Sequence, residues 1–364
     1  MQNRISAEMK MEGKVMYDLN QLIMMGREEN ASDLHISAGM PLMMRVHGKL
    51  EQTLAQPDDH ETELMLYGLL DERQKERLAE GYDIDFALET PDHNRQRVNV
   101  FRQQGKIAAT IRLLNNHIPT LEELHMPQLL YKLAEEPRGL ILVTGPTGSG
   151  KSTTLAAMIE HINQTRAEHI ITIEDPVEYT YESKMALIHQ RETGRDVIDF
   201  ASALRSALRE DPDIILVGEM RDYETIMAAL TAAETGHLVL STLHTTGAAQ
   251  TIERVIDACP SESQNQARTQ LAGVLKGVIT QCLMPVPDGR GRIAGTEILL
   301  GTDAITNLIR ENKSHQMSSM MQSGGASGMH TLNMDLMRLV REGYITKETA
   351  VQYTNDKRDL EQYF

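Results

Sequence analysis

Short aliphatic runs alternate with amphipathic stretches along the C-terminal two thirds of the chain. The runs predict buried strands over Gly139–Thr144, His169–Ile173, Ile214–Gly218 and Leu238–Leu243. The stretches between them have apolar residues at helical spacing and predict helices over Ser152–Asn163, Phe200–Arg209 and Tyr223–Thr235. Strands that alternate with helices in this way are typical of a parallel sheet with crossover helices, so the predicted fold class is α/β.

Helical spacing dominates the segments on either side of this core. A helix is predicted over Leu121–Glu135, before the first strand. After Gly247 the pattern becomes mostly helical, and the predicted helices are Ala248–Asp257, Glu262–Thr280, Asp303–Glu311 and Thr331–Glu342.

The N-terminal part of the chain predicts a smaller mixed α/β domain over residues 17–114. Its predicted elements are helices at Tyr17–Glu29 and Glu61–Glu80, a strand at Ala31–Ser37, and hairpins formed by Met43–His47 with Gly48–Leu54 and by Arg97–Arg102 with Ile107–Leu113. A polar run that reaches Pro119 indicates a linker at 115–120, followed by the larger domain at 121–364. Residues 1–16 are interpreted as an extension, either disordered or an expression remnant.

Composition narrows the class of function. The chain has 364 residues and a formal net charge of −16, which disfavours broad binding to nucleic acid because phosphate contacts need a basic surface. Its aliphatic runs are strand-sized, well short of the roughly 20 residues that cross a bilayer. The two cysteines, Cys259 and Cys282, are far apart, so neither a disulfide framework nor a cysteine zinc site is expected.

A phosphate-binding loop follows the first predicted strand. The segment matches G-x-x-x-x-G-K-[ST] at every position and opens a predicted helix: Gly145, Pro146, Thr147, Gly148, Ser149, Gly150, Lys151 and Ser152. Glycines let backbone N–H groups turn toward phosphates, and the helix N-terminus adds partial positive charge. Lys151 then reaches the β- and γ-phosphates of ATP, and the Ser152 hydroxyl can bind Mg²⁺. Thr153, the next residue, is included in the predicted nucleotide site.

Acidic and imidazole groups follow the other predicted strands. Glu174 and Glu219 come at strand ends that meet the phosphate loop in a parallel sheet, where a carboxylate can orient water or hold the metal's water shell. Either glutamate could instead cap a helix, or Glu219 could pair with Arg221. His237 and His244 stand at the two ends of the fourth strand; a histidine there can contact the γ-phosphate or have a structural role.

Four segments together resemble the motifs of the secretion ATPase superfamily, and more closely those of the type IV pilus retraction ATPases. They are the phosphate loop, the acidic box Ile173–Glu178, the stretch Leu208–Asp222 and the histidine box Thr235–Thr245. Ala31–His35 and Ala304–Glu311 also resemble segments of that family. The resemblance extends from about Tyr17 to the C-terminus.

The resemblance implies a RecA-like P-loop core with a PAS-like N-terminal domain and a hexameric, Mg²⁺-dependent ATPase. In that family pattern Glu219 belongs to the Walker B element, Glu174 is the first choice for general base, and Arg221 lies beside the nucleotide. Arginines of the N-terminal domain reach a neighbouring subunit's nucleotide; Arg97, Arg102 and Arg112 are the candidates, with a solvated, salt-bridged strand face as the alternative. The implied partners are a pilus platform protein at the cytoplasmic face of the inner membrane and other pilus ATPases, and no nucleic acid.

Two features depart from the family pattern: Thr306 replaces an arginine of the C-terminal motif, and residues 1–16 have no counterpart. Pilus assembly ATPases have a larger N-terminal region and a four-cysteine zinc site, so retraction is favoured over assembly. Two alternatives stay open: an accessory ATP-binding pilus subunit with weak hydrolysis, and a nucleic-acid translocase.

Overall fold

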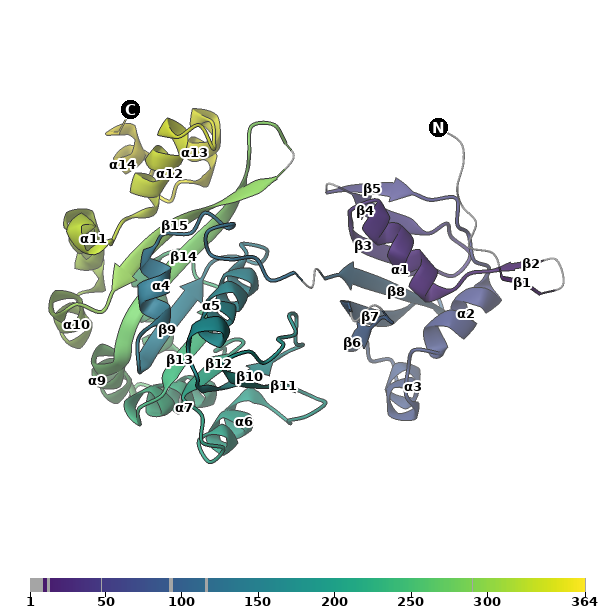
Figure 1. The fold of residues 1–364 in the computed structure, drawn as a ribbon, viewed down its shortest axis with the longest axis horizontal. Helices are drawn as coiled ribbons and strands as arrows, with labels where there is room; N and C mark the ends of the chain where they lie inside the picture. The colour runs from purple at the N-terminus through teal and green to yellow at the C-terminus, as the bar shows by residue number, and fades with distance from the viewer. Residues whose placement is uncertain are drawn as a thin grey trace. The chain divides into compact units, whose positions relative to one another are not determined.

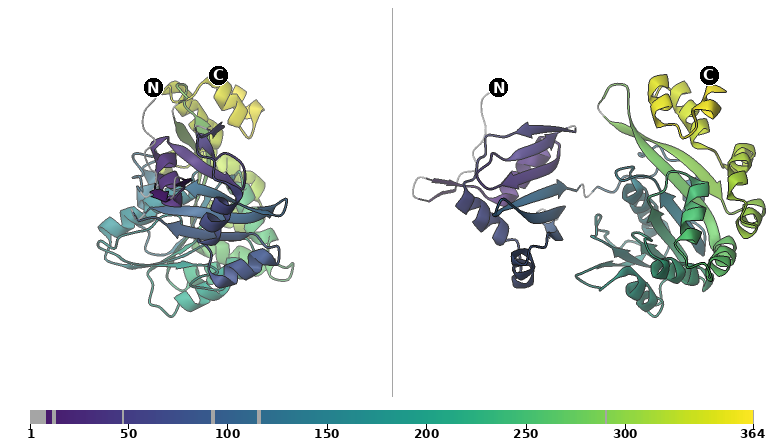
Figure 2. Two further views of the ribbon diagram at one scale, coloured as in Figure 1. Left: turned by 90° about the vertical axis from the view of Figure 1, so that its right-hand side faces the viewer. Right: turned by 180° about the vertical axis from the view of Figure 1, so that it is seen from behind.

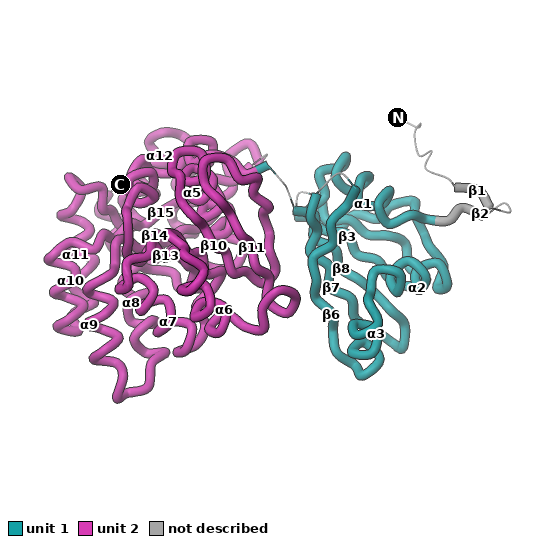
Figure 3. The backbone as a smooth tube through the Cα atoms, turned by 60° about the horizontal axis from the view of Figure 1, so that its bottom comes forward, with its two compact units in different colours: residues 1–117 teal, residues 118–364 magenta. Residues whose placement is uncertain are grey.

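A computed structural model describes residues 9–11, 14–46, 48–91, 94–114, 117–289 and 291–363. The chain divides into two compact units, residues 1–117 and 118–364, which are coloured separately in Figure 3. The predicted linker includes residues 115 and 116, which lie outside the described residues. Figure 1 labels the helices and strands of both units.

The N-terminal unit is built on a six-stranded sheet in the order β5-β4-β3-β8-β7-β6, in which all neighbouring strands are antiparallel. Its strands are β3 (Ala31–Ser37), β4 (Met43–Val46), β5 (Lys49–Gln52), β6 (Ile84–Glu89), β7 (Arg95–Gln103) and β8 (Lys106–Leu113). Its helices are α1 (Leu19–Glu28), α2 (Asp59–Tyr67) and α3 (Glu72–Ala79). Ahead of them, β1 (Met9–Met11) pairs antiparallel with β2 (Lys14–Met16).

The single helix predicted over Glu61–Glu80 is wrong, because two helices lie there. Asp58 and Asp71 each accept a hydrogen bond from the backbone N–H three residues later, and the side chain at that position bonds back to the aspartate N–H. Each arrangement is a capping box, which starts a helix. The second one, at Asp71, therefore begins α3 as a separate element.

The sheet of the N-terminal unit has one apolar and one polar face. Alternate residues such as Leu34, Val98 and Ile111 are buried in one cluster with side chains of the helices. Since neighbouring residues of a strand point to opposite faces, Arg97 and its cross-strand partner Arg112 lie on the other face.

The C-terminal unit contains a seven-stranded sheet in the order β11-β10-β12-β13-β9-β14-β15. Its strands are β9 (Gly139–Thr144), β10 (His169–Glu174), β11 (Leu187–Glu192), β12 (Ile214–Val217), β13 (Leu238–Leu243), β14 (Leu275–Pro285) and β15 (Arg292–Leu300). All pairs are parallel except the long hairpin of β14 and β15, drawn in light green in Figure 2. The predicted α/β class is confirmed, and the sheet is mixed rather than purely parallel.

Helices cover both faces of this sheet. One buried cluster packs α4 and α5 against the strands, and another packs α6 to α11 against the opposite face. A third cluster joins α12, α13 and α14 to the β14–β15 hairpin. The helices are α4 (Leu129–Ala134), α5 (Lys151–Thr165), α6 (Phe200–Ala207), α7 (Tyr223–Glu234), α8 (Ala248–Asp257), α9 (Gln264–Val274), α10 (Asp303–Arg310), α11 (Met317–Ser323), α12 (Leu332–Arg341), α13 (Lys347–Tyr353) and α14 (Lys357–Glu361), with short 3₁₀ turns at Ser314–Gln316 and Gly325–Ser327. No helix among the described residues is long and apolar enough to cross a membrane.

The predicted helix over Glu262–Thr280 is wrong over its last six residues, 275–280. Helix α9 ends at Val274, and Leu275 begins β14, which lies beside β9 in the sheet interior. A strand that is buried on both faces has no alternation of apolar and polar residues, so its pattern continues that of the preceding helix. The sequence did not predict strands β6, β11 and β15. Of the helix predicted over Leu121–Glu135, the structure has only α4.

Candidate functional site

The phosphate loop joins the buried strand β9 to helix α5 at the carboxyl edge of the sheet. Gly145 has φ of 143°, and a Cβ atom there would lie 2.2 Å from the carbonyl oxygen of Gln281. Gly150 is the N-cap of α5 and has φ of 90°, in the left-handed region that favours glycine. The loop therefore needs glycine at these two positions, and it presents the N-terminus of a 15-residue helix.

Lys151 lies inside the loop and is 8% exposed. Its ammonium group donates to the carbonyl oxygens of Gly145 at 2.9 Å and Pro146 at 3.1 Å, and it lies 3.4 Å from Nδ1 of His244. Burial lowers the pKa of Lys151, while the charges of Glu219 and Glu178 oppose this shift. The cation is thus fixed within the curve of the loop.

Glu219 and His244 meet beside this lysine. His244 Nε2 lies 3.3 Å from Glu219 Oε1, and Arg221 Nη2 lies 2.7 Å from Glu219 Oε2. Because an ammonium group can only donate, His244 Nδ1 accepts from Lys151, and this assignment leaves the proton on Nε2 facing Glu219. Burial alone would raise the pKa of Glu219, but the hydrogen bond and charge of Arg221, together with the contact to His244, outweigh it and lower the pKa below its ordinary value.

Helix α7, which follows Glu219, is capped by Asp222, whose side chain accepts from the N–H of Thr225. The capping alternative therefore does not describe Glu219. Its pairing with Arg221 does occur, together with the contact to His244. The structure brings Lys151, Glu219, Arg221 and His244 into one cluster drawn from three strand ends.

Glu174 ends strand β10, next to the strand that leads to Glu219. A main-chain hydrogen bond joins the ends of these two strands, since Gly218 N–H donates to Ile173 O at 2.8 Å. The Glu174 carboxylate accepts a hydrogen bond from Thr172 Oγ1 at 2.6 Å. Burial raises the pKa of Glu174 to about 7, despite the opposing hydrogen bonds. A carboxylate with that pKa is suited to accept a proton near neutral pH.

Tyr179, the residue after the acidic box, contacts the helix that follows the phosphate loop. Tyr179 OH lies 3.0 Å from Oγ1 of Thr153 in the first turn of α5. Ser152 is exposed in the same turn. Among the residues that the structure describes, no group of three His, Cys, Asp or Glu side chains could hold a metal ion by itself. The Ser152 hydroxyl and the Glu219 carboxylate fit Mg²⁺, because this ion is usually held by one or two protein oxygens together with phosphates and water.

His237 is not part of this cluster, and its predicted place in the nucleotide site is corrected. It precedes β13, whose first residue Leu238 pairs with Gly139 at the start of β9, so it lies at the opposite edge of the sheet from the phosphate loop. His237 Nδ1 lies 2.9 Å from the carbonyl oxygen of Ala232 near the end of α7. Within this chain its contacts are structural.

The three candidate arginines belong to the N-terminal unit and do not share one face. Arg97 and Arg112 are directly opposite on β7 and β8. Arg97 Nε lies 3.9 Å from Asp85 Oδ1, and Arg112 Nε lies 3.0 Å from Asp33 Oδ1. Arg102 lies five residues beyond Arg97, on the face covered by helices, and donates to Tyr67 OH of α2 at 2.6 Å. The polar face thus carries two of the three candidates.

Gln281 is a site residue that the sequence did not reveal. This β14 side chain is 2% exposed. Its Nε2 donates to the Ser149 carbonyl oxygen at 2.7 Å, and its Oε1 accepts from Thr154 Oγ1 at 3.0 Å. One amide therefore braces both the phosphate loop and the first turns of α5. The signal is absent because the predicted helix over Glu262–Thr280 hides the start of β14, and Gln281 lies just beyond it, outside every predicted element.

Together, the glycine-rich loop, its buried lysine and the strand-end carboxylates define a P-loop NTPase with a RecA-like core. The family model described as "Type II/IV secretion system protein" matches residues 8–355, and the chain belongs to that family. This match begins at residue 8, so part of the N-terminal extension does have a counterpart.

Close relatives refine this assignment. The chain is 50% identical over 334 residues to the type IV pilus retraction ATPase PilT of Pseudomonas aeruginosa, covering 92% of this chain and 97% of the relative. It is 50% identical over 309 residues to a twitching motility protein of Neisseria gonorrhoeae, covering 85% and 83%. A crystal structure of the pilus retraction motor PilT with bound ADP superimposes with a TM-score of 0.88 at 44% identity, covering 95% of this chain and 99% of that one.

Proposed function

We propose that this chain is an ATP-hydrolysing motor that powers type IV pilus retraction and twitching motility. The identity to retraction ATPases over nearly the whole chain supports the biological process. The observation that carries the chemistry is the contact of Lys151 with His244, and of His244 with Glu219, at the phosphate loop.

The described side chains divide the work of hydrolysis. The loop N–H groups and Lys151 hold the phosphates of ATP and stabilise the charge that develops on the transferred group. Ser152 and Glu219 would hold Mg²⁺, which when bound neutralises charge between the β- and γ-phosphates. Glu174 accepts the proton of the attacking water, since its raised pKa makes it a stronger base than an ordinary carboxylate. His244 donates from Nε2 and links the phosphate end of the site to Glu219.

The N-terminal unit would complete a neighbouring subunit's site in a homo-hexamer. Arg97 and Arg112 are the stronger candidates for an arginine supplied in trans, because they lie together on the polar face, whereas Arg102 is bonded to α2. In well-studied systems such an arginine raises kcat of phosphoryl transfer by about 10³–10⁵-fold. The proposed partners are a pilus platform protein at the cytoplasmic face of the inner membrane and other pilus ATPases.

Thr306 lies on the inner face of α10 and is 9% exposed. Its hydroxyl donates to the Asp303 carbonyl oxygen within the same helix at 3.1 Å. The position where the family pattern has arginine therefore forms no part of the phosphate cluster. We propose that Thr306 affects coupling to the pilus rather than hydrolysis, which favours a motor over an accessory subunit with weak hydrolysis.

Phosphate release with Mg²⁺ and ATP, measured together with solution mass, tests this proposal. Wild-type protein should hydrolyse ATP as a six-subunit particle. Lys151→Ala should lower kcat by about 10²–10³-fold, the usual cost of removing one donor to a transition-state anion, and keep the thermal melting temperature. Lys132→Ala, at an exposed lysine on α4, is the control and should retain full activity. Normal turnover by folded Lys151→Ala would refute the site.

A further inference from the structure

The four residues after β13, His244–Gly247, form a loop whose far end is tied to the C-terminal helices. We call it the histidine loop, since His244 at its start contacts Lys151 and Glu219. Two side chains distant in sequence hold this part of the chain. Asn355 binds the main chain of the loop, and Glu297 binds the residue that follows the loop. Neither side chain takes part in the chemistry described above.

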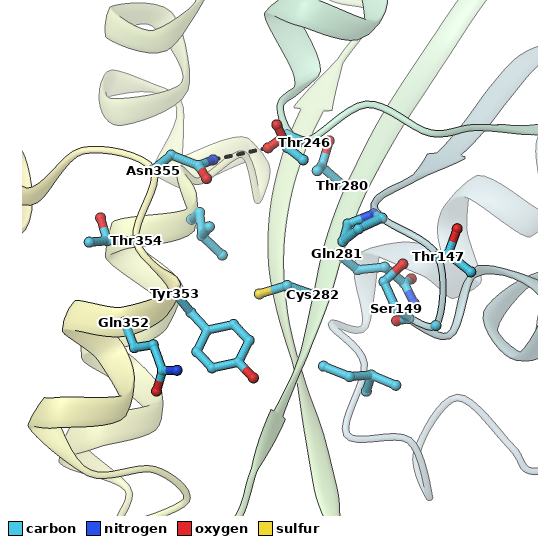
Figure 4. A pocket seen from close by; sticks show the side chains of 14 residues that line it. Thr147, Ser149, Thr246, Thr280, Gln281, Cys282, Gln352, Tyr353, Thr354 and Asn355 are labelled. Carbon is cyan, nitrogen blue, oxygen red and sulfur yellow. Dashed lines mark hydrogen bonds between the residues drawn. The ribbon is translucent and has the colours of Figure 1, made fainter. Parts of the chain in front are cut away.

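Asn355 lies between α13 and α14 and binds the loop directly. Its Nδ2 donates to the carbonyl oxygen of Thr246 at 2.9 Å, the dashed line in Figure 4. Asn355 is itself held in place by its neighbours. Thr354 Oγ1 donates to Asn333 Oδ1 at 2.5 Å, and Asn333 Nδ2 donates to the Asp356 carbonyl oxygen at 2.9 Å. The segment around Asn355 is therefore fixed to helix α12.

Glu297 of β15 binds the residue that follows the loop. It is 8% exposed, and its Oε1 accepts from the N–H of Ala248 at 2.7 Å, while Oε2 accepts from the N–H of Leu332 at 3.3 Å. Ala248 and Leu332 are the first residues of α8 and α12. One buried carboxylate thus joins two helix N-termini, where negative charge is favoured.

A cavity of about 480 Å³ lies beside the Asn355 contact, as Figure 4 shows. The phosphate loop contributes Thr147 and Ser149 to its lining, and the C-terminal segment contributes Tyr353 and Asn355. Thr246 also lines this cavity, so the hydrogen bond from Asn355 to Thr246 lies at its edge.

We propose that Asn355 is a positioning residue for ATP hydrolysis: through the Thr246 carbonyl it holds the histidine loop, and with it His244, against Glu219 and Lys151. Glu297 fixes the next residue, so the C-terminal helices set where the loop ends. The histidine loop contacts the phosphate end of the site. Together with the C-terminal helices, it then forms one mechanical unit. This inference rests on the proposed ATPase function.

The direct test is Asn355→Asp, which keeps the size of the side chain but replaces the donor with an acceptor facing a carbonyl oxygen. We expect kcat to fall about threefold to tenfold, the range that one hydrogen bond contributes. Affinity for a fluorescent ADP analogue should stay within about twofold of wild type, because the phosphate loop itself is unchanged. Gln352→Glu makes the same charge change in the same segment and should behave as wild type.

Hydrogen–deuterium exchange of Asn355→Ala gives a second readout that does not require turnover. Exchange should rise at the amides of 245–248 and stay unchanged at 148–152. The inference would be overturned if Asn355→Asp had the kcat of wild type, or if Gln352→Glu lost as much kcat as Asn355→Asp. It would also be overturned if Asn355→Asp lost ADP affinity in parallel with kcat, or if exchange at the histidine loop were unchanged in Asn355→Ala. If wild-type protein did not hydrolyse ATP, the proposed function would fail, whereas an active wild type with an unaffected Asn355→Asp rejects the inference alone.

Discussion

The raised pKa of Glu174 predicts how turnover depends on pH. Burial shifts this pKa to about 7, and only the ionised carboxylate can accept a proton from water. Activity should therefore fall as the pH drops below about 7. At pH 6 roughly one carboxylate in 11 is ionised, so kcat/KM should be about a tenth of its plateau value. A glutamate with an ordinary pKa would remain almost fully ionised at pH 6, and its profile would be flat there.

The hydrogen bond from Thr172 provides the matched perturbation. Thr172 is fully buried, and its hydroxyl donates to the Glu174 carboxylate at 2.6 Å, which lowers the pKa of Glu174. Thr172→Val keeps the shape and removes the donor, so the pKa of Glu174 should rise and the inflection should move to higher pH. At pH 7 the variant should then be less active than wild type, and the difference should shrink at alkaline pH.

The assay is phosphate release at low ATP from pH 5.5 to 9, because kcat/KM reports ionisation in the free enzyme. Thr269→Val, an exposed threonine on α9 whose hydroxyl donates to the Asn265 carbonyl oxygen, is the control and should retain the wild-type profile. A wild-type profile that is flat between pH 6 and 8 would refute the assignment of Glu174 as base. So would an inflection that Thr172→Val leaves unmoved.

Two further substitutions test the frame of the site. Gln281→Leu removes both bonds that brace the loop and leaves the Ser149 carbonyl oxygen without this donor, so affinity for a fluorescent ADP analogue should weaken about tenfold; a wild-type titration curve would argue against the brace. Ile215→Ala, at a fully buried position of central strand β12, should lower the free energy of unfolding by about 2–5 kcal/mol in urea titrations, and a loss below about 1 kcal/mol would contradict the packing described.

The sequence was most informative where the chemistry is local. The phosphate loop is continuous in sequence, and the strands that lead to Glu174, Glu219 and His244 are short aliphatic runs with polar ends. Gln281 could not be found in the same way. Its strand continues the apolar pattern of α9, and its role depends on β14 lying beside β9, a pairing distant in sequence.

Two site predictions could have been sharper from the sequence alone. His237 precedes its strand, so a parallel sheet already puts it at the edge opposite the phosphate loop. Arg97 and Arg102 are five positions apart on one strand, an odd offset, so they point to opposite faces. In contrast, the pairing of Arg97 with Arg112 depends on the hairpin register, and the pKa of Glu174 depends on burial by residues far along the chain.

The central claim is that strand-end carboxylates activate water at a triphosphate held by the loop. Single-turnover hydrolysis of ATP, with enzyme in excess, tests it most directly in wild type and Glu174→Gln. Glu174→Gln should bind ATP with near wild-type affinity and release phosphate about 10²–10⁴-fold more slowly, the usual contribution of a positioned base. Phosphate release at the wild-type rate by a folded, ATP-bound Glu174→Gln protein would contradict the account.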